Sequence, residues 1–157
     1  MKPTVAVLIA LALVAGAEAQ SKMDLCNTVK IVDIARIIGA KLTKATPDPS
    51  PSSASCGYAN DDPNRYGFPL VVIQVFLNSD ANTAAQSMQK LKGVEAVSGV
   101  GQRAFWYTIS RGSRQLVVIA GPRTWFNVNV YDDTVSGGNP KGAATEIAKL
   151  VIARVKL

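Results

Sequence analysis

The sequence predicts an α+β domain in which a mostly antiparallel sheet of about five strands has helices packed on it. Short β-branched and aromatic runs recur between residues 56 and 131. Three of these runs follow one another across short turns, which favours antiparallel hairpins over parallel crossovers. Apolar residues at helical spacing occur before, between and after the strands. Together these observations define the fold class.

The chain has 157 residues, of which 48% are hydrophobic and 18% charged, as expected for a single globular domain. Residues 1–19 combine Lys2, an apolar run and the small-residue sequence Ala17-Glu18-Ala19, a pattern typical of a secretory signal peptide. We therefore expect residues 20–157 to form one domain that is periplasmic or secreted. The apolar run is shorter than the roughly 20 residues that a transmembrane helix needs, so no transmembrane segment is expected.

The two cysteines, Cys26 and Cys56, allow one intramolecular pairing. An exported chain meets an oxidising compartment, where such a pair forms a disulfide. Catalytic redox cysteines usually lie two residues apart, whereas these lie thirty apart. The spacing therefore favours a structural bridge.

The first element is predicted to be a helix that Asp24 caps and Gly39 ends. Ile31, Ile34, Ala35 and Ile38 follow the i, i+3, i+4, i+7 spacing of one buried helix face. Residues 46–55 are rich in Pro and Ser, which predicts a surface loop.

The next elements are two strands and a helix. A short strand is expected at residues 56–59, before a turn at 60–64. Residues 68–77 are long, apolar and β-branched, which predicts a strand near the centre of the sheet. Residues 81–91 then have the spacing of a modest helix.

The remaining strands are expected at residues 104–110, 115–120 and 124–131, joined as a meander. In the last of them Phe126 and Val128 face one side, whereas Asn127 and Asn129 face the other, so one face of this strand is less apolar. A polar loop and a closing helix at residues 142–155 complete the chain.

The absence of histidine removes every Ser-His, Cys-His and His-metal arrangement. We expect no catalytic residue, no metal ligand and no cofactor. Ser87 and Lys90 have the Ser-x-x-Lys spacing of penicillin-recognising enzymes, but their Ser-Asp-Asn and Lys-Thr-Gly strings do not occur in this sequence. The string from Gly99 to Ala104 fits a dinucleotide fingerprint, but strand-forming residues follow it where a helix is required, so we interpret it as a turn.

Basic residues dominate the stretch from Lys90 to Arg123, where six positive side chains accompany one acid. Arg111, Arg114, Arg123 and Trp125 are therefore the candidate partner-binding residues. Arginines beside aromatic rings suit an anionic partner such as a lipid headgroup, a cell-wall polymer or an acidic protein. Nucleic acid is not expected as a partner of an exported chain.

The order of short motifs resembles small secreted or lipoprotein-borne bacterial domains of unknown function. The motifs are Asp24 with Cys26, Ile38-Gly39, Cys56-Gly57-Tyr58, and Gly99-Val100-Gly101 with Ala104 and Phe105. The resemblance implies a cysteine bridge and an α+β sandwich of PsbP-like type, and it carries over no catalytic residue. Many such domains are lipidated, whereas this chain lacks a cysteine directly after its signal-like segment.

These observations lead to one main functional expectation and two alternatives. The first is an exported, non-enzymatic binding or accessory module of the bacterial envelope that uses the basic-aromatic surface. The second is a periplasmic carrier of a small apolar ligand held between sheet and helices. The third is a histidine-free hydrolase, which would need convergent carboxylates or a Ser-Lys pair.

Overall fold

A computed structural model describes residues 23–48, 50–62 and 68–157 of the chain. The predicted signal peptide at residues 1–19 lies outside the described residues. Within them, no helix is both long enough and apolar enough to cross a membrane.

In the described part of the chain, seven strands form one antiparallel sheet in the order β1-β2-β3-β7-β6-β5-β4. The strands are β1 (Lys44–Pro47), β2 (Ala54–Ala59), β3 (Val71–Leu77), β4 (Glu95–Val97), β5 (Arg103–Ser110), β6 (Ser113–Gly121) and β7 (Thr124–Tyr131). The predicted α+β class and antiparallel sheet are confirmed, and so is the meander of β5, β6 and β7. The predicted strand at residues 68–77 is confirmed over Val71–Leu77, whereas residues 68–70 precede it, and its predicted place near the centre of the sheet is confirmed because β3 lies beside the central β7.

The expected number of about five strands is wrong, because β1 and β4 also belong to the sheet. Both lie at its edges, are only three or four residues long and are mostly exposed. Edge strands of this kind lack the apolar alternation on which sequence prediction depends. For the same reason the predicted loop at residues 46–55 is partly wrong, since Thr46 and Pro47 end β1 and Ala54 begins β2.

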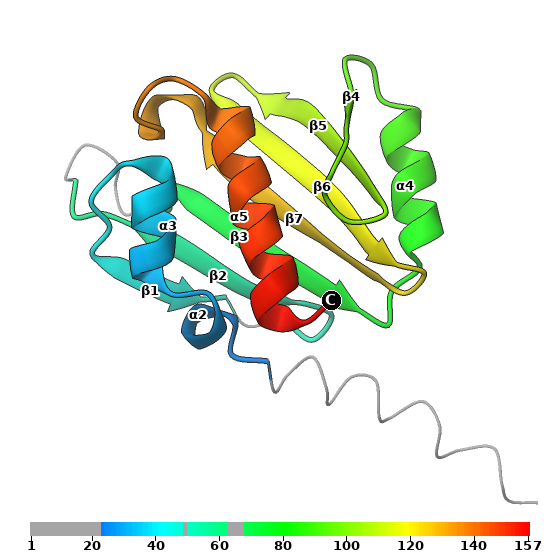
Figure 1. Ribbon diagram of the computed structural model, residues 1–157, viewed down its shortest axis with the longest axis horizontal. Coiled ribbons are helices and arrows are strands. Elements are labelled where there is room, and N and C mark those ends of the chain that lie inside the picture. The colour runs from blue at the N-terminus through cyan, green and yellow to red at the C-terminus, as the bar shows by residue number, and fades with distance from the viewer. Residues whose placement is uncertain (1–22, 49, 63–67) are drawn as a thin grey trace, which may run out of the picture.

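Helices pack on both faces of the sheet, and Figure 1 is seen from the face that carries α3 (Ile31–Ile38) and α5 (Pro140–Val155). The described helices are α2 (Leu25–Thr28), α3 (Ile31–Ile38), α4 (Ala81–Gln89), α5 (Pro140–Val155) and the short 3-10 helix η2 (Asp132–Thr134). The first two and α5 pack on one face. Successive side chains of β5 and β6 point to opposite faces, and those that pack against α4 point away from the main core. The helix α4 therefore lies on the opposite face, over β5, β6 and β7.

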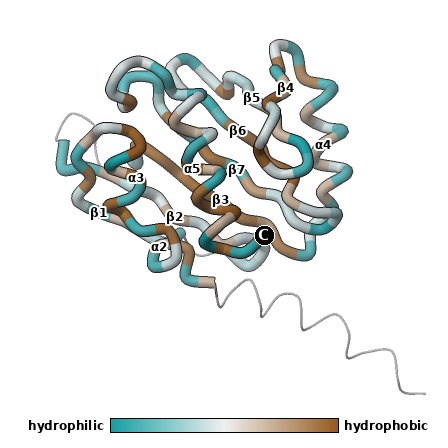
Figure 2. The backbone as a smooth tube through the Cα atoms, viewed as in Figure 1, coloured by the Kyte–Doolittle hydropathy of each residue, from teal (hydrophilic) through white to brown (hydrophobic). Residues whose placement is uncertain are grey.

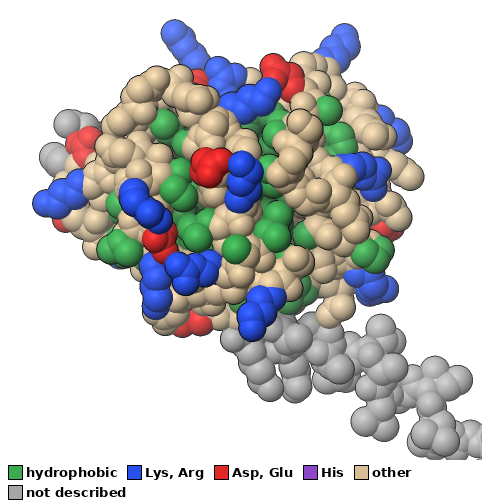
Figure 3. Space-filling model, viewed as in Figure 1, with side chains coloured by type: hydrophobic (Ala, Val, Ile, Leu, Met, Phe, Trp, Pro, Cys, Tyr) green, Lys and Arg blue, Asp and Glu red, His purple; other side chains and the backbone are tan. Residues whose placement is uncertain are grey.

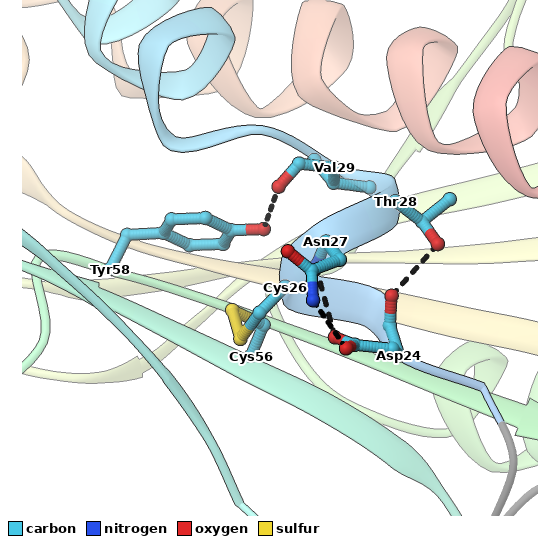
Figure 4. Close-up of a disulfide and its surroundings, with 7 residues drawn as sticks. All are labelled: Asp24, Cys26, Asn27, Thr28, Val29, Cys56 and Tyr58. Carbon is cyan, nitrogen blue, oxygen red and sulfur yellow. Dashed lines mark hydrogen bonds between the residues drawn. A yellow bond between two sulfur atoms is a disulfide. The ribbon is translucent and has the colours of Figure 1, made fainter.

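The single N-terminal helix predicted from the sequence is divided in two. Asp24 does cap a helix, but α2 ends at Thr28, and Val29 and Lys30 are extended before α3 begins. The buried Tyr58 hydroxyl donates a hydrogen bond of 2.8 Å to the Val29 carbonyl at this break (Figure 4). The hydrogen bond satisfies a carbonyl that the interrupted helix leaves unpaired. Gly39, at φ +66°, ends α3 as predicted.

The main core lies between the sheet and α2, α3 and α5. Its members include the fully buried Ile34, Ile147, Phe126, Val128 and Leu116. A second, smaller cluster lies under α4. In Figure 2 the hydrophobic segments of the central strands run through the middle of the fold, as expected for a sheet covered on both faces.

Candidate functional site

A cavity of about 500 Å³ lies between α4 and the sheet, on the face opposite to α5. It is lined by side chains from α4 and the residues just before it, and from β5, β6 and β7. The lining residues are Ser79, Asp80, Thr83, Ala84, Ser87, Met88, Tyr107, Gln115, Val117, Trp125 and Asn127. Small-molecule sites in proteins are usually concave spaces of this size, mostly apolar with a few placed polar groups.

Alanine side chains set the distance between α4 and the sheet. Ala81 and Ala85 are fully buried against Phe105 and Ile119, and these small residues allow one side of the helix to approach closely. Ala84 and the longer Met88 are partly buried beside the cavity. The polar residues Thr83 and Ser87 are exposed along its rim.

Asn127 lies on the cavity side of β7, as the alternation of this strand predicts. Only 6% of the residue is exposed. Its Oδ1 is buried and is the one such side-chain atom in the described part of the chain that makes no hydrogen bond. Its cross-strand neighbours donate no hydrogen bond to this oxygen, because Val117 is apolar and the amide of Gln74 donates to the Ser53 hydroxyl at 2.8 Å. A buried acceptor without a donor costs free energy of folding.

A row of hydrogen-bonded, neutral side chains crosses three strands next to Asn127. The Tyr107 hydroxyl donates to Oε1 of Gln115, whose Nε2 donates to Oδ1 of Asn129. Burial raises the pKa of Tyr107, so its hydroxyl stays protonated at neutral pH. This row of hydrogen bonds holds the cavity-lining side chains of Tyr107 and Gln115 in place.

Trp125 forms an aromatic wall of the cavity and is fixed on two sides. Its indole Nε1 donates to the Ser79 hydroxyl at 3.1 Å. Its ring stacks on Phe76 with centroids 3.9 Å apart and planes 11° from parallel. An aromatic ring held in this way loses little conformational entropy when a ligand packs against it.

The carboxylate of Asp80 is used in capping α4. One oxygen accepts from the backbone N–H groups of Asn82 and Thr83 at 2.9 and 3.2 Å, and the other accepts from the Thr83 hydroxyl at 2.8 Å. These hydrogen bonds lower the pKa of Asp80, with a smaller contribution from the positive charge of Arg123. Asp80, the one acidic side chain among the described lining residues, is therefore ionised and already hydrogen-bonded.

The four residues predicted to bind a partner do not form one cluster. Arg111 lies at the β5–β6 turn, and Arg114 near the start of β6 pairs with Asp132 at 2.9 Å. Arg123 lies at the other end of β6, where its guanidinium donates to the Asn78 carbonyl at 3.0 Å. The structure thus brings Arg123 and Trp125 together near the cavity and separates them from Arg111 and Arg114.

The basic side chains on the opposite face are dispersed as well. Figure 3 shows Lys and Arg spread over the face that carries α3 and α5, several of them beside Asp or Glu. Lys141 pairs with Glu95 and Lys149 with Glu146. No one region of this view collects the positive charge.

Two further motifs have structural roles. The Ser87 hydroxyl donates to the Thr83 carbonyl one turn earlier in α4 at 2.8 Å, so its proton is directed into the helix. Residues 99–102 of the glycine string form the turn before β5, in which Gly99 and Gly101 have φ values of +77° and +60°, and Arg103 and Ala104 begin the strand. The interpretation of this string as a turn is confirmed.

The predicted disulfide between Cys26 and Cys56 is present and joins α2 to β2, with the two Cα atoms 5.3 Å apart (Figure 4). Neither element lines the cavity. Among the described residues, no group of three or more acidic or cysteine side chains is placed to hold a metal ion.

Sequence reasoning missed most of the cavity wall. It placed Trp125 among the candidate residues and recognised the polar face of β7, but it gave no site role to Asn127 or Gln115. The signal available was the cross-strand row of amide and hydroxyl side chains that the meander brings together. No pattern in the sequence indicated that α4 lies over that row.

Comparison with known proteins adds little. No protein-family model matches the chain, and no curated protein matches it. A solved structure of a GTP-binding regulator from Thermotoga maritima is similar over 77% of this chain and 86% of its own, with 8% sequence identity and a TM-score of 0.42. A likeness at this level carries no argument about function.

Proposed function

We propose that this chain is an exported, non-enzymatic binding module of the bacterial envelope, and that its site is the cavity under α4, which holds a small uncharged ligand. The observation that carries the proposal is the cavity of about 500 Å³ itself, whose wall combines the fixed ring of Trp125 with the polar side chains of Gln115 and Asn127. Ligand sites in proteins are usually concave spaces of this size, with mostly apolar walls and a few placed polar groups.

Export is supported by the sequence of residues 1–19 and by the disulfide. A bridge between Cys26 and Cys56 is stable in an oxidising compartment such as the periplasm or the extracellular space. The envelope location rests on the resemblance to small secreted bacterial domains, and the PsbP-like form of the sandwich rests on the same resemblance.

The non-enzymatic part of the proposal is supported by the titratable groups of the cavity. Asp80 is ionised and its two oxygens are occupied, while Tyr107 is neutral and donates its proton to Gln115. Neither has the pKa near neutrality that a general acid or base needs. Ser87, the candidate nucleophile, directs its proton into the helix backbone.

The cavity favours the ligand-carrying alternative over the basic-aromatic surface. Two arginines of that surface, Arg114 and Arg123, hydrogen-bond to Asp132 and to the Asn78 carbonyl, and they stand at opposite ends of β6. A partner that contacted both ends would cover the length of the strand. A small ligand under α4 needs only the residues already assembled there, with Trp125 shared by both proposals.

Native mass spectrometry of the protein purified from its own periplasm, beside the denatured mass of the same sample, tests the proposal. We expect extra mass of a small molecule in the native state only. Ala84→Phe, which extends an aromatic ring into the cavity, should reduce or abolish that extra mass. Gln86→Phe is the matched control, because Gln86 is exposed on α4 and does not line the cavity.

The proposal would be contradicted if Ala84→Phe retained the bound molecule, which would then occupy another site. It would also be contradicted if the wild-type protein showed no extra mass and remained unchanged in melting temperature when incubated with the small-molecule extract of its host's periplasm.

A further inference from the structure

We propose that α4 is a lid over the cavity. Its C-terminal end swings away from the sheet about its hydrogen-bonded N-terminal end, and this motion lets a ligand enter and leave. The inference rests on the proposed function and adds how access to the same site is controlled. It combines the unequal attachment of the two ends of α4, the exposure of the segment that follows it and the backbone conformation of Gly93.

The N-terminal end of α4 is attached to the sheet by several hydrogen bonds. The backbone N–H groups of Ser79 and Ala81 donate to carbonyls of the β6–β7 turn at 3.0 and 3.3 Å. The Ser79 hydroxyl accepts from the indole of Trp125, and the guanidinium of Arg103 donates to Oδ1 of Asn82 at 3.0 Å. Ala81 is also fully buried. This end of the helix is therefore held in position.

The C-terminal half of α4 lacks such attachment. Ala85 is the last buried residue of the helix, and every residue from 86 to 99 is at least partly exposed. Residues 84–92 form hydrogen bonds within the helix and its final turn, and among the described residues none joins them to the sheet. Met88 packs against the smaller core cluster but is only partly buried. Segments with few buried contacts separate from a fold at low free-energy cost.

This weakly attached half forms part of the cavity wall. Ser87 and Met88 line the cavity from α4, while Tyr107 and Gln115 line it from the sheet. An outward swing of the C-terminal end widens the space between these two sets of side chains. Trp125 stays in place, because it is hydrogen-bonded to the fixed end of the helix.

Gly93 provides the hinge at the other end of the lid, in the loop between α4 and β4. It has φ +75°, and nothing lies within 4 Å of the position that a Cβ would take. In Figure 1 this loop projects from the edge of the fold. Glycine can change φ between positive and negative values without the steric cost that other residues meet. The backbone can therefore absorb the swing while β4 keeps its pairing with β5.

Cysteine labelling measures the opening. Val117 lies on β6 in the cavity wall and is only 3% exposed, so a thiol at this position reacts slowly unless the wall opens. Val128→Cys is the reference, because Val128 is fully buried in the main core. N-ethylmaleimide, applied to protein with its disulfide intact, should label Val117→Cys at least about tenfold faster than Val128→Cys, since the lid opens without global unfolding.

Two glycine substitutions in the Val117→Cys background identify α4 as the moving element. Gly93→Ala places a side chain at φ +75°, which strains the closed form, and the strain is relieved when φ changes on opening. Labelling should become about five- to thirtyfold faster. Gly112→Ala is the matched control, because Gly112 has φ +78° and equally open surroundings but lies in the β5–β6 turn. It should leave the labelling rate within about twofold.

Three results would contradict the lid. Labelling of Val117→Cys as slow as that of Val128→Cys would mean that the cavity wall opens only when the whole protein unfolds. Labelling as fast as that of a cysteine in an unfolded peptide would mean that the thiol is accessible without any movement of α4. Equal effects of Gly93→Ala and Gly112→Ala would show that α4 does not swing about Gly93.

This labelling needs no ligand, so it separates the lid from the proposed function. Val117→Cys protein that carries the extra mass of native mass spectrometry should be labelled more slowly than the same protein after unfolding in urea and refolding without that mass, because a ligand in the cavity favours the closed form. Labelling that depends on Gly93 in a protein without extra mass would support the motion of α4 and contradict the ligand site. Extra mass whose removal leaves the labelling rate unchanged would contradict the lid.

Discussion

At the scale of single residues, the buried amide of Asn127 lowers the stability of the fold. Its buried Oδ1 has no hydrogen-bond partner, and a group of this kind costs about 1–3 kcal/mol. Asn127→Leu is close to it in shape and removes the unpaired acceptor. We therefore expect this variant to raise the free energy of unfolding by about 1–3 kcal/mol, measured by urea denaturation.

Asn129→Leu is the control for this prediction. The two asparagines lie on the same face of β7, but Oδ1 of Asn129 accepts a hydrogen bond from Gln115. Its removal should lower stability, because Nε2 of Gln115 loses its acceptor. If both variants lowered stability equally, the unpaired state of Asn127 would be refuted.

A second prediction at this scale concerns the glycine turn before β5. Gly101 has φ +60°, and a Cβ there would lie 2.6 Å from the carbonyl oxygen of Ile119. Gly99 has a similar φ of +77°, with nothing within 4 Å of its Cβ position. Gly101→Ala should therefore destabilise the protein by roughly 1–3 kcal/mol more than Gly99→Ala does in thermal or urea unfolding. Equal losses would mean that backbone conformation alone requires these glycines.

At the scale of elements, the cap of α4 makes stability depend on pH. Hydrogen bonds hold the pKa of Asp80 below its usual value of 3.8 in the folded protein. A lowered folded-state pKa gives stability that is present above pH 3.8 and is lost as the pH falls through the folded-state pKa. We expect the urea midpoint to drop below about pH 4, and Asp80→Asn to reduce that drop.

Asparagine is the informative substitution because it also caps helices well. Asp80→Asn should keep most of the stability at pH 7 and lose part of the acid dependence, while Asp24, whose pKa is also lowered by its capping bonds to Asn27, continues to contribute. An acid profile identical to that of the wild-type protein would show that the α4 cap does not open at low pH.

The way each element is buried explains whether the sequence could predict it. The strands β3, β6 and β7 and the helix α5 bury regular apolar stripes, and periodicity located them. The exposed edge strands β1 and β4 carry no such stripe. The break between α2 and α3 was missed because Val29 continues the apolar spacing, although its carbonyl bonds to Tyr58 instead of continuing the helix.

At the scale of the whole molecule, the candidate site depends on which face of the sheet each helix covers. Alternation along β7 correctly placed Asn127 and Trp125 on the face away from Phe126. It did not reveal that α4 crosses to that face while α5 covers the other. This choice depends on long-range packing of Ala81 and Ala85 on Phe105 and Ile119, which no local pattern encodes.

The disulfide stabilises the molecule at a distance from the cavity. It closes a loop between residues 30 apart in sequence, which contributes about 3–4 kcal/mol in the chain-entropy model. The variant with Cys26→Ala and Cys56→Ala should lose about this much free energy of unfolding in urea at neutral pH. A loss near zero would mean that the buried contacts of α2 and Tyr58 already hold this region together.

Two measurements make this prediction specific to the bridge. A phosphine reductant should lower the urea midpoint of the wild-type protein towards that of the double alanine variant, and it should leave the variant unchanged. Because no residue of α2 or β2 lines the cavity, the double variant purified from the periplasm should carry the same extra mass in native mass spectrometry as the wild-type protein. Loss of that mass would show that the two ends of the sheet are energetically coupled.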